Sequence, residues 1–115
     1  MNSLIETLFK NFSVDGVAIP VSFLEYQGNE TTYITYQNID TDNSFSGDDE
    51  ILGYVDYYDI DIFSKGNYLK VVKEVKKIMK TGGFMWQPSR TSQDMKEVDT
   101  GMYHKTLCFA IEREE

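Results

Sequence analysis

The chain has few of the residues that build common active sites. Its 115 residues include one cysteine, Cys108, and one histidine, His104. A single cysteine excludes an internal disulfide and a thiolate zinc cluster, and a single histidine leaves a two-histidine metal site or a histidine hydrolase without its parts. We expect Cys108 to be a small buried strand residue and His104 to lie at the surface or rim. We expect no bound metal and no cofactor.

Long apolar segments are absent as well. The longest apolar runs cover only a few residues, and Glu6 interrupts the segment from Met1 to Phe9. A membrane-spanning helix needs about 20 apolar residues, and a signal peptide needs a basic start followed by an apolar core, so the sequence predicts neither. Its hydrophobic fraction of 41% and aromatic fraction of 14% are typical of a globular, β-rich chain, which we expect to form a single domain over residues 1–115.

Basic residues are missing from a long part of the chain. Between Lys10 and Lys65 there is no lysine or arginine but there are eleven carboxylates, whereas residues 65–80 hold six lysines and one glutamate. The net charge of -8 is therefore divided into an acidic block and a basic block. A net negative chain repels phosphate, which argues against general nucleic-acid binding. Two oppositely charged faces would instead allow identical copies to dock.

Hydrophobic periodicity predicts two helices. Ser3 and Glu6 form a capping-box pattern, which predicts a first helix over about residues 3–12. Asn67 is positioned to cap a second helix that ends before residues 81–83. The second helix has an apolar arc and an opposite basic side, and the basic side consists of Lys70, Lys73, Lys76, Lys77 and Lys80.

Strand patterns fill the rest of the chain. Residues 17–26 are apolar but contain Pro20, so they predict at best an edge strand or an extended segment. Residues 33–37 predict a strand of β-branched and aromatic residues. Residues 51–63 predict a long strand with an apolar face and an acidic face. Residues 84–87 and 104–113 predict the last two strands, whereas residues 40–50 lack a period and predict a long exposed loop.

These elements predict an α+β fold. We expect a small antiparallel or mixed sheet packed against two helices, in the order α-β-β-β-α-β-β. The long strand carries Asp56, Asp59 and Asp61, which in principle supply a general acid and a general base. No nucleophile or oxyanion donor accompanies them in the sequence, so we expect a protein that is not an enzyme and has no catalytic residues.

The sequence also contains a segment that only partly matches a calcium-binding loop. Asp40, Asp42 and Ser44 resemble its opening, but the glycine falls at position 47 and the twelfth residue is Ile51 instead of a bidentate glutamate. Weak cation binding by the acidic residues 48–50 stays open beside the simpler interpretation of a solvated loop.

The order of several short segments resembles a known family. Residues 33–36, residues 57–65, an amphipathic helix, Gly83-Phe84 and residues 99–105 follow one another before a terminal strand. This layout resembles the small tail-completion or tail-to-head joining proteins of long-tailed bacteriophages and prophages, and it is similar to the tail terminators of lambda-like phages. The resemblance spans residues 17–111, and it depends on the order and spacing of the segments.

The resemblance implies a structural virion protein. Such a subunit closes as a ring, with six copies expected, on the head-proximal end of the tail tube, and it joins the tail to the head. The implied partners are other copies of the chain, the tail tube protein and a head-completion or connector protein. DNA passes through the ring without specific binding, and the protein resides in the virion tail after assembly in the host cytoplasm.

Charge and resemblance together select two candidate surfaces. The lysines of the second helix, Lys70, Lys73, Lys76, Lys77 and Lys80, are the candidate subunit interface. Asp48, Asp49 and Glu50 are the candidate acidic ring surface, either facing the lumen or contacting a neighbouring subunit. The alternative function is a small acidic host adaptor of ferredoxin-like shape, which would bind one host protein through its sheet edge.

Overall fold

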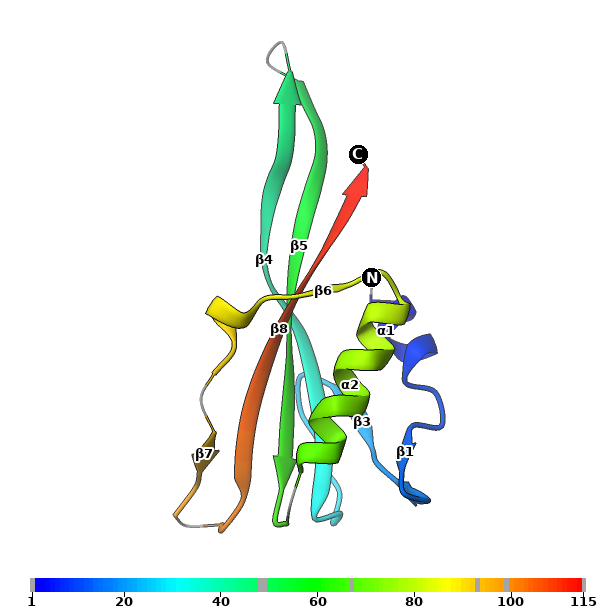
Figure 1. The fold of residues 1–115 in the computed structure, drawn as a ribbon, viewed down its shortest axis with the longest axis vertical. Coiled ribbons are helices and arrows are strands. Elements are labelled where there is room, and N and C mark those ends of the chain that lie inside the picture. Colours follow the sequence, from blue (N-terminus) through cyan, green and yellow to red (C-terminus); the bar gives the residue numbers. More distant parts are fainter. Residues whose placement is uncertain (1, 48–49, 67, 93, 99, 115) are drawn as a thin grey trace.

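Apolar alternation in the long central strand organises a strongly twisted mixed sheet (Figure 1). The computed structural model describes residues 2–47, 50–66, 68–92, 94–98 and 100–114. The elements in chain order are α1 (Asn2–Leu8), β1 (Ser13–Val14), β2 (Val17–Ala18), β3 (Val21–Phe23), β4 (Thr32–Gly47), β5 (Glu50–Ser64), α2 (Leu69–Thr81), β6 (Met85–Trp86), a 3₁₀ turn (Pro88–Arg90), β7 (Met95–Lys96) and β8 (Tyr103–Glu114).

The main sheet has the order β3-β4-β5-β8-β6, and β7 also pairs with β8. β3 runs parallel to β4 and the other pairs are antiparallel, so the predicted α+β class with a mixed sheet and two helices is confirmed. The predicted order α-β-β-β-α-β-β is wrong. β1 and β2 form a separate hairpin before β3, and β7 lies in a segment that the polar composition had left without a strand.

The predicted exposed loop over residues 40–50 is also wrong. β4 continues to Gly47 and pairs with β5 along its whole length, with register shifts at three places. Asp and Asn have low strand propensity, but the partner strand imposes the extended conformation through cross-strand bonds. For example, the Thr41 hydroxyl donates to Asp56 at 2.7 Å, and Asp56 also accepts a bond from Arg113 at 2.7 Å. Asp48 and Asp49 lie outside the described residues.

The far end of this hairpin, beyond the last pair with β8 at Gly53, extends past the other strands. We call residues 38–47 and 50–57 the arm. β3 pairs with β4 only at residues 34–36, and β8 pairs with β5 only as far as Gly53. Among the described strands, none pairs with the outer edge of β4 along the arm. The arm makes the protein elongated, with extents of 52 × 28 × 23 Å, and Figure 1 shows it rising past the C-terminal end of β8.

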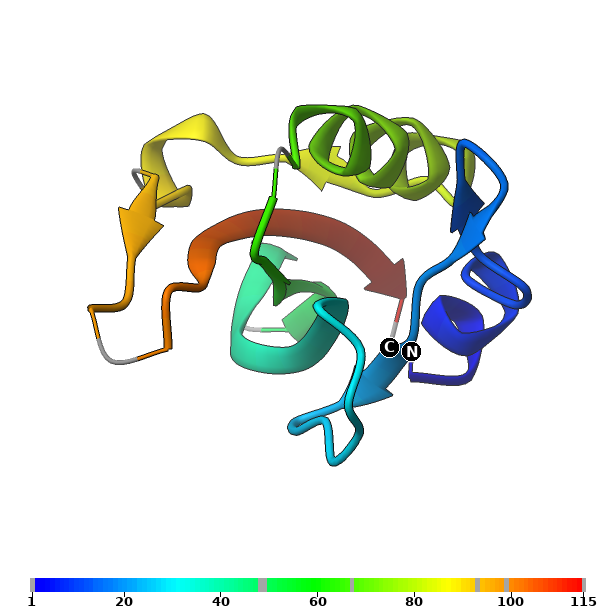
Figure 2. The ribbon, with the colours of Figure 1, turned by 90° about the horizontal axis from the view of Figure 1, so that it is seen from below.

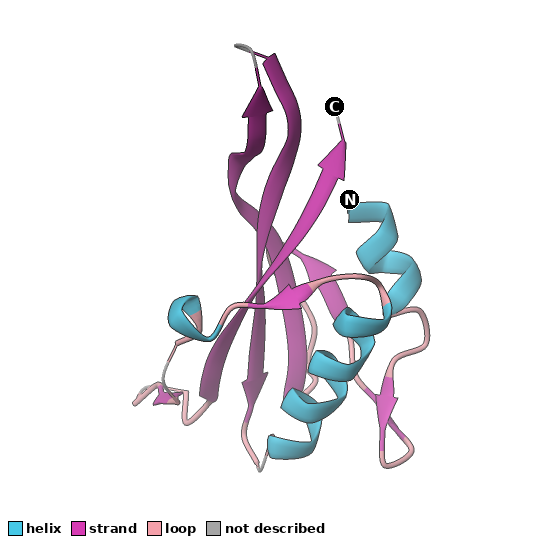
Figure 3. Cartoon of the chain, turned by 45° about the horizontal axis from the view of Figure 1, so that its top comes forward, coloured by secondary structure: helices cyan, strands magenta, loops and turns pink. Residues whose placement is uncertain are grey.

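The core lies between one face of the sheet and the two helices, which Figures 2 and 3 show on the same side of the sheet. The predicted apolar arc of α2 is confirmed, because Val71, Val72, Val75 and Met79 are buried. They pack in one cluster with strand residues such as Ile60 and Leu107. The first described residue before α2 is Tyr68, which makes no side-chain capping bond, and the predicted cap Asn67 lies outside the described residues.

The first helix is shorter than predicted. It ends at Leu8, and Asn11 adopts a left-handed conformation with φ 58°, which turns the chain away from the helix axis. Phe9 and Phe12 are nevertheless buried, and their rings meet edge to face at 5.2 Å. The sequence period therefore located the buried residues correctly but misplaced the end of the helix.

Candidate subunit-contact surfaces

The five candidate interface lysines lie on the side of α2 that faces away from the core. Their spacing of three or four residues follows the helical period, so the burial of the valines fixes where the lysines point. Lys73, Lys77 and Lys80 are exposed, and within the described residues none of these three forms an ion pair. This stripe is a positive surface without a partner in the described part of the chain.

Lys70, at the start of α2, differs from the other lysines. Its amine donates to Asp15 at 2.9 Å, and the side chains are 75% and 65% exposed. The hydrogen bond and the charge of Asp15 raise the pKa of Lys70. Solvent screens such an exposed pair, but it neutralises the basic face at this end within a single protomer. The two charged regions are therefore separate along most of α2 and in contact at its beginning.

Lys76 makes a contact that sequence reasoning missed. Its ammonium group lies 3.6 Å from the centre of the Trp86 ring, in a cation–π contact. The Trp86 indole N–H donates to the Thr91 hydroxyl at 2.7 Å, and that hydroxyl donates to the carbonyl of Gln87 at 3.0 Å. The Lys76 ammonium and the hydrogen bond to Thr91 therefore both hold the Trp86 ring in place. A lone tryptophan just after a lysine-rich helix was the available signal, but only the pairing of β6 with β8 brings the two residues together.

A groove lies between the end of α2 and β6. It has a volume of about 300 Å³ and is lined by Lys76, Lys80, Phe84, Met85, Trp86 and Phe109. Met85 and Trp86 are 53% and 40% exposed, so this end of the lysine face continues into an apolar surface.

The acidic arm is the second candidate surface. Asp40 and Asp42 are exposed on it, and Asp40 lies 4.0 Å from Arg90. Of the three predicted ring-surface residues, Asp48 and Asp49 lie outside the described residues, and Glu50 begins β5 opposite Gly47. Glu50 therefore lies at the far end of the arm.

Asp56 does not belong to the acidic surface. It is buried, and it bonds to Thr41 and Arg113 as described above. The sequence contained the signal for this, because Asp56 has the same parity as the buried residues Tyr58 and Ile60.

A polar cluster lies on the sheet face opposite the helices. It consists of Asp59, Asp61, His104, Thr106 and Cys108, which alternate along β5 and β8 and face one another in register. Asp61 accepts bonds from the Thr106 hydroxyl at 2.5 Å and from His104 Nε2 at 3.1 Å. The His104 ring stacks on Phe63 at 4.2 Å between centroids, and Tyr33 and Tyr26 continue the stack across the sheet.

This cluster is not arranged as a catalytic triad. A triad needs the hydroxyl and the carboxylate on opposite nitrogens of the imidazole ring. Here Thr106 and Asp61 both approach Nε2 of His104, at 3.3 Å and 3.1 Å. The same hydroxyl also bonds to Asp61, so the geometry joins β5 to β8 and does not activate a nucleophile.

Cys108 is buried, as predicted. Burial, followed by the negative charge of Asp59, raises the pKa of Cys108 to about 11. The thiol is therefore protonated at neutral pH and unreactive as a nucleophile. His104 is 21% exposed at the rim of the same face, in agreement with the predicted surface or rim position.

Asp59 should reduce stability at neutral pH. Burial, and secondarily the Asp61 charge, raises the pKa of Asp59. Above about pH 3.9, the ordinary pKa of an aspartate, the unfolded chain loses this proton before the folded protein does, so the stability contribution falls as pH rises. We expect Asp59→Asn to raise the thermal midpoint at pH 7 by a few degrees, with a gain that shrinks toward pH 4. The exposed-site control Asp42→Asn should show no such gain, and an equal gain in both variants would contradict the assignment.

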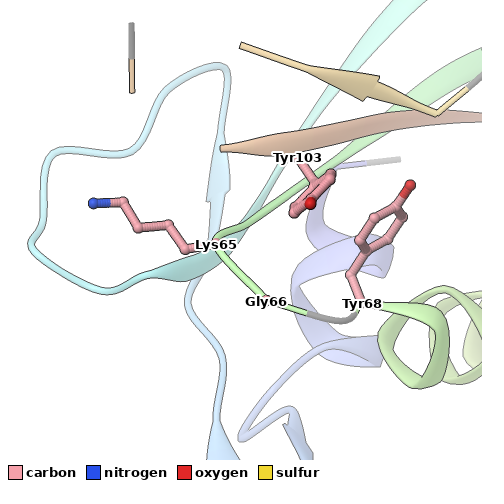
Figure 4. Close-up of a pocket in the computed structure, with 4 residues that line it drawn as sticks. All are labelled: Lys65, Gly66, Tyr68 and Tyr103. Atoms are coloured by element: carbon pink, nitrogen blue, oxygen red, sulfur yellow. The ribbon is translucent and has the colours of Figure 1, made fainter. Parts of the chain in front are cut away.

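A second pocket opens at the other end of α2 (Figure 4). It has a volume of about 370 Å³ and is lined by Lys65, Gly66, Tyr68 and Tyr103. The Tyr68 hydroxyl donates to Asp94, which also accepts from Lys105, and burial raises the pKa of Tyr68 to about 12. In Figure 4 the amine of Lys65 points away from both tyrosine rings. These contacts attach the segment before β7 to the body of the protein.

Neither a scan of protein-family models nor a search of curated proteins gave a match. Within the described ranges, no group of three or more His, Cys, Asp or Glu side chains is placed to hold a metal ion. No helix in the same part of the chain has the length and apolar character needed to cross a membrane. The two charged surfaces and the elongated shape of the protein are the features that bear on its function.

Proposed function

We propose that this chain is a structural virion protein that closes as a ring on the head-proximal end of a phage tail tube and joins the tail to the head. The observation that supports this most directly is the presence of two different charged surfaces on one subunit. Within the described residues, Lys73, Lys77 and Lys80 form a positive stripe that makes no ion pair, and the arm presents the exposed carboxylates of Asp40 and Asp42.

A closed ring of identical subunits needs this kind of asymmetry. In a head-to-tail contact, each copy presents one patch to the neighbour on one side and a different, complementary patch to the neighbour on the other. Opposite charges on the two patches favour the correct docking orientation and disfavour contacts between like patches. The arm gives the subunit an element that reaches beyond its own body to a neighbour, as its 52 Å long dimension allows.

The net charge also suits a ring around a DNA channel. A subunit charge of -8 gives the assembled ring a strongly negative field. Asp48, Asp49 and Glu50 are the proposed acidic ring surface, and any of these carboxylates that face the lumen repel phosphate, so the genome passes without binding. The proposed role is not enzymatic, because the geometry around His104 supports no nucleophile.

Loss of the chain should separate heads from tails. In a long-tailed phage or prophage that encodes this protein, we expect particles assembled without it to accumulate as filled heads and free tails. Purified protein added back should restore joining, and electron microscopy with quantitative mass spectrometry should find a fixed cyclic number of copies, six by analogy, at one end of each tail. Normal particles without the chain would contradict the proposal. A one-to-one complex with a host protein would instead favour the adaptor function.

A further inference from the structure

We propose that the groove between α2 and β6 receives the acidic arm of a second copy of this chain. This inference rests on the proposed ring, because it names the two surfaces that meet at each subunit contact. The groove has the chemistry of an anchor site: Phe84 and Phe109, which are 3% and 1% exposed, line it together with Lys76 and Lys80. An apolar floor beside two cations fits a partner segment that carries both an apolar side chain and carboxylates.

The groove is fixed before any partner arrives. β6 pairs with β8 through Met85 and Trp86, and the Trp86 ring is held by its bond to Thr91 and by the Lys76 ammonium. Fixed side chains lose little conformational entropy on binding, so more of the contact energy appears as affinity. Trp86 and Met85 together supply exposed apolar area at the position where an incoming side chain would lie.

The arm carries the complementary groups. Ile39 is the extra residue of a β-bulge, because Asn38 pairs with Tyr58 and Asp40 pairs with Tyr57. Its side chain is 42% exposed, and two exposed carboxylates follow it along the strand: Asp40, which lies 4.0 Å from Arg90, and Asp42, which forms no ion pair among the described residues. An exposed apolar residue followed by two carboxylates matches a groove with an apolar floor and a lysine rim. The free edge of β4 leaves this segment open to contact over residues 38–47.

The occupant is a second copy because the outer edge of β4 and the groove at β6 lie on opposite sides of the sheet, with β5 and β8 between them. Figure 1 shows the arm rising beyond the level at which β6 crosses the sheet, away from α2. An arm that leaves one subunit and binds the groove of the next makes a heterologous contact, which closes into a ring when the rotation between copies divides a full turn.

Cross-linking tests the contact directly. Two single variants, Asp42→Cys on the arm and Met85→Cys in the groove, are mixed at high protein concentration and low salt and then oxidised. The native Cys108 is buried and its thiol pKa is about 11, so it should not compete. We expect the mixture to give several-fold more covalent dimer than a control mixture of Asp42→Cys with Val98→Cys. Val98 is 95% exposed and follows β7, which pairs with β8 at Tyr103–His104 and not at Phe109–Ala110 beside β6.

Two further outcomes separate this inference from the proposed function. Adding Lys76→Glu and Lys80→Glu to the groove variant should lower the dimer yield to that of the control pair. If the Asp42→Cys and Met85→Cys mixture, without the lysine substitutions, gives no more covalent dimer than the control mixture, the groove contact is rejected. This holds even when rings are seen on tails. The opposite combination is efficient cross-linking of the purified protein and normal joining of heads to tails in particles that lack the chain. That result would support the groove contact and reject the tail-joining role.

Discussion

Reversing Lys73, Lys77 and Lys80 to glutamate together should abolish head-to-tail joining and leave a folded monomer. The three side chains are exposed, and within the described residues they form no ion pair whose loss would destabilise the fold. The reversal changes the proposed attractive contact with a neighbour's acidic arm into repulsion between like charges, which costs several kcal/mol at an interface. Of the three lysines, only Lys80 lies in the last turn of α2. Its positive charge interacts favourably with the helix dipole there and stabilises the helix by about 0.3–1 kcal/mol.

The measurement is complementation of joining with purified variants, alongside circular dichroism and thermal unfolding. The matched control reverses Lys10, Lys65 and Lys96, which are also exposed and change the net charge by the same amount. We expect the control to join heads and tails at close to the normal yield. Undiminished joining by the α2 triple variant would remove the lysine stripe from the subunit contact, and equal loss in both variants would indicate a nonspecific charge effect.

Replacing Ile60 by alanine should cause the largest loss of stability among single substitutions on β5. Ile60 is 0% exposed at the centre of the sheet, where it pairs with Tyr36 on one side and Leu107 on the other. Truncating a fully buried isoleucine removes transfer energy and leaves a cavity, at a cost of about 2–5 kcal/mol. This cost is a large share of the free energy of unfolding of a small domain, which is roughly 5–15 kcal/mol.

Urea unfolding at pH 7 measures this loss as a shift in midpoint at constant slope. Val98→Ala is the control, because Val98 is 95% exposed and its truncation should change the free energy of unfolding by no more than about 0.5 kcal/mol. A loss below about 1 kcal/mol for Ile60→Ala would mean that the site collapses around the smaller side chain, and would contradict a closely packed centre of the sheet.

The helices and the central strand were predictable because their own residues determine them. In α2 the buried valines repeat with the helical period, and in β5 the apolar residues alternate, so local sequence and tertiary packing agree. The same is true of Cys108, whose neighbours in the sequence alternate between the two faces. The fold class follows from these elements and needed no information about distant contacts.

The arm and the groove were not predictable because other parts of the chain determine them. Residues 40–47 have the composition of a loop, and they form a strand only because β5 is paired beside them. The cation–π contact of Lys76 depends on where β6 crosses the sheet, which no local pattern encodes. The lysine stripe itself was visible in the sequence, whereas the apolar surface that continues it was not.

The outer edge of β4 also bears on how the isolated protein avoids fibre formation. An uncovered strand edge offers amide and carbonyl groups to any other extended chain, which is the usual start of runaway sheet growth. Asp40 and Asp42 lie along this edge, and two such edges brought together would place carboxylates opposite carboxylates. The acids of the arm therefore disfavour pairing between the β4 edges of two free copies.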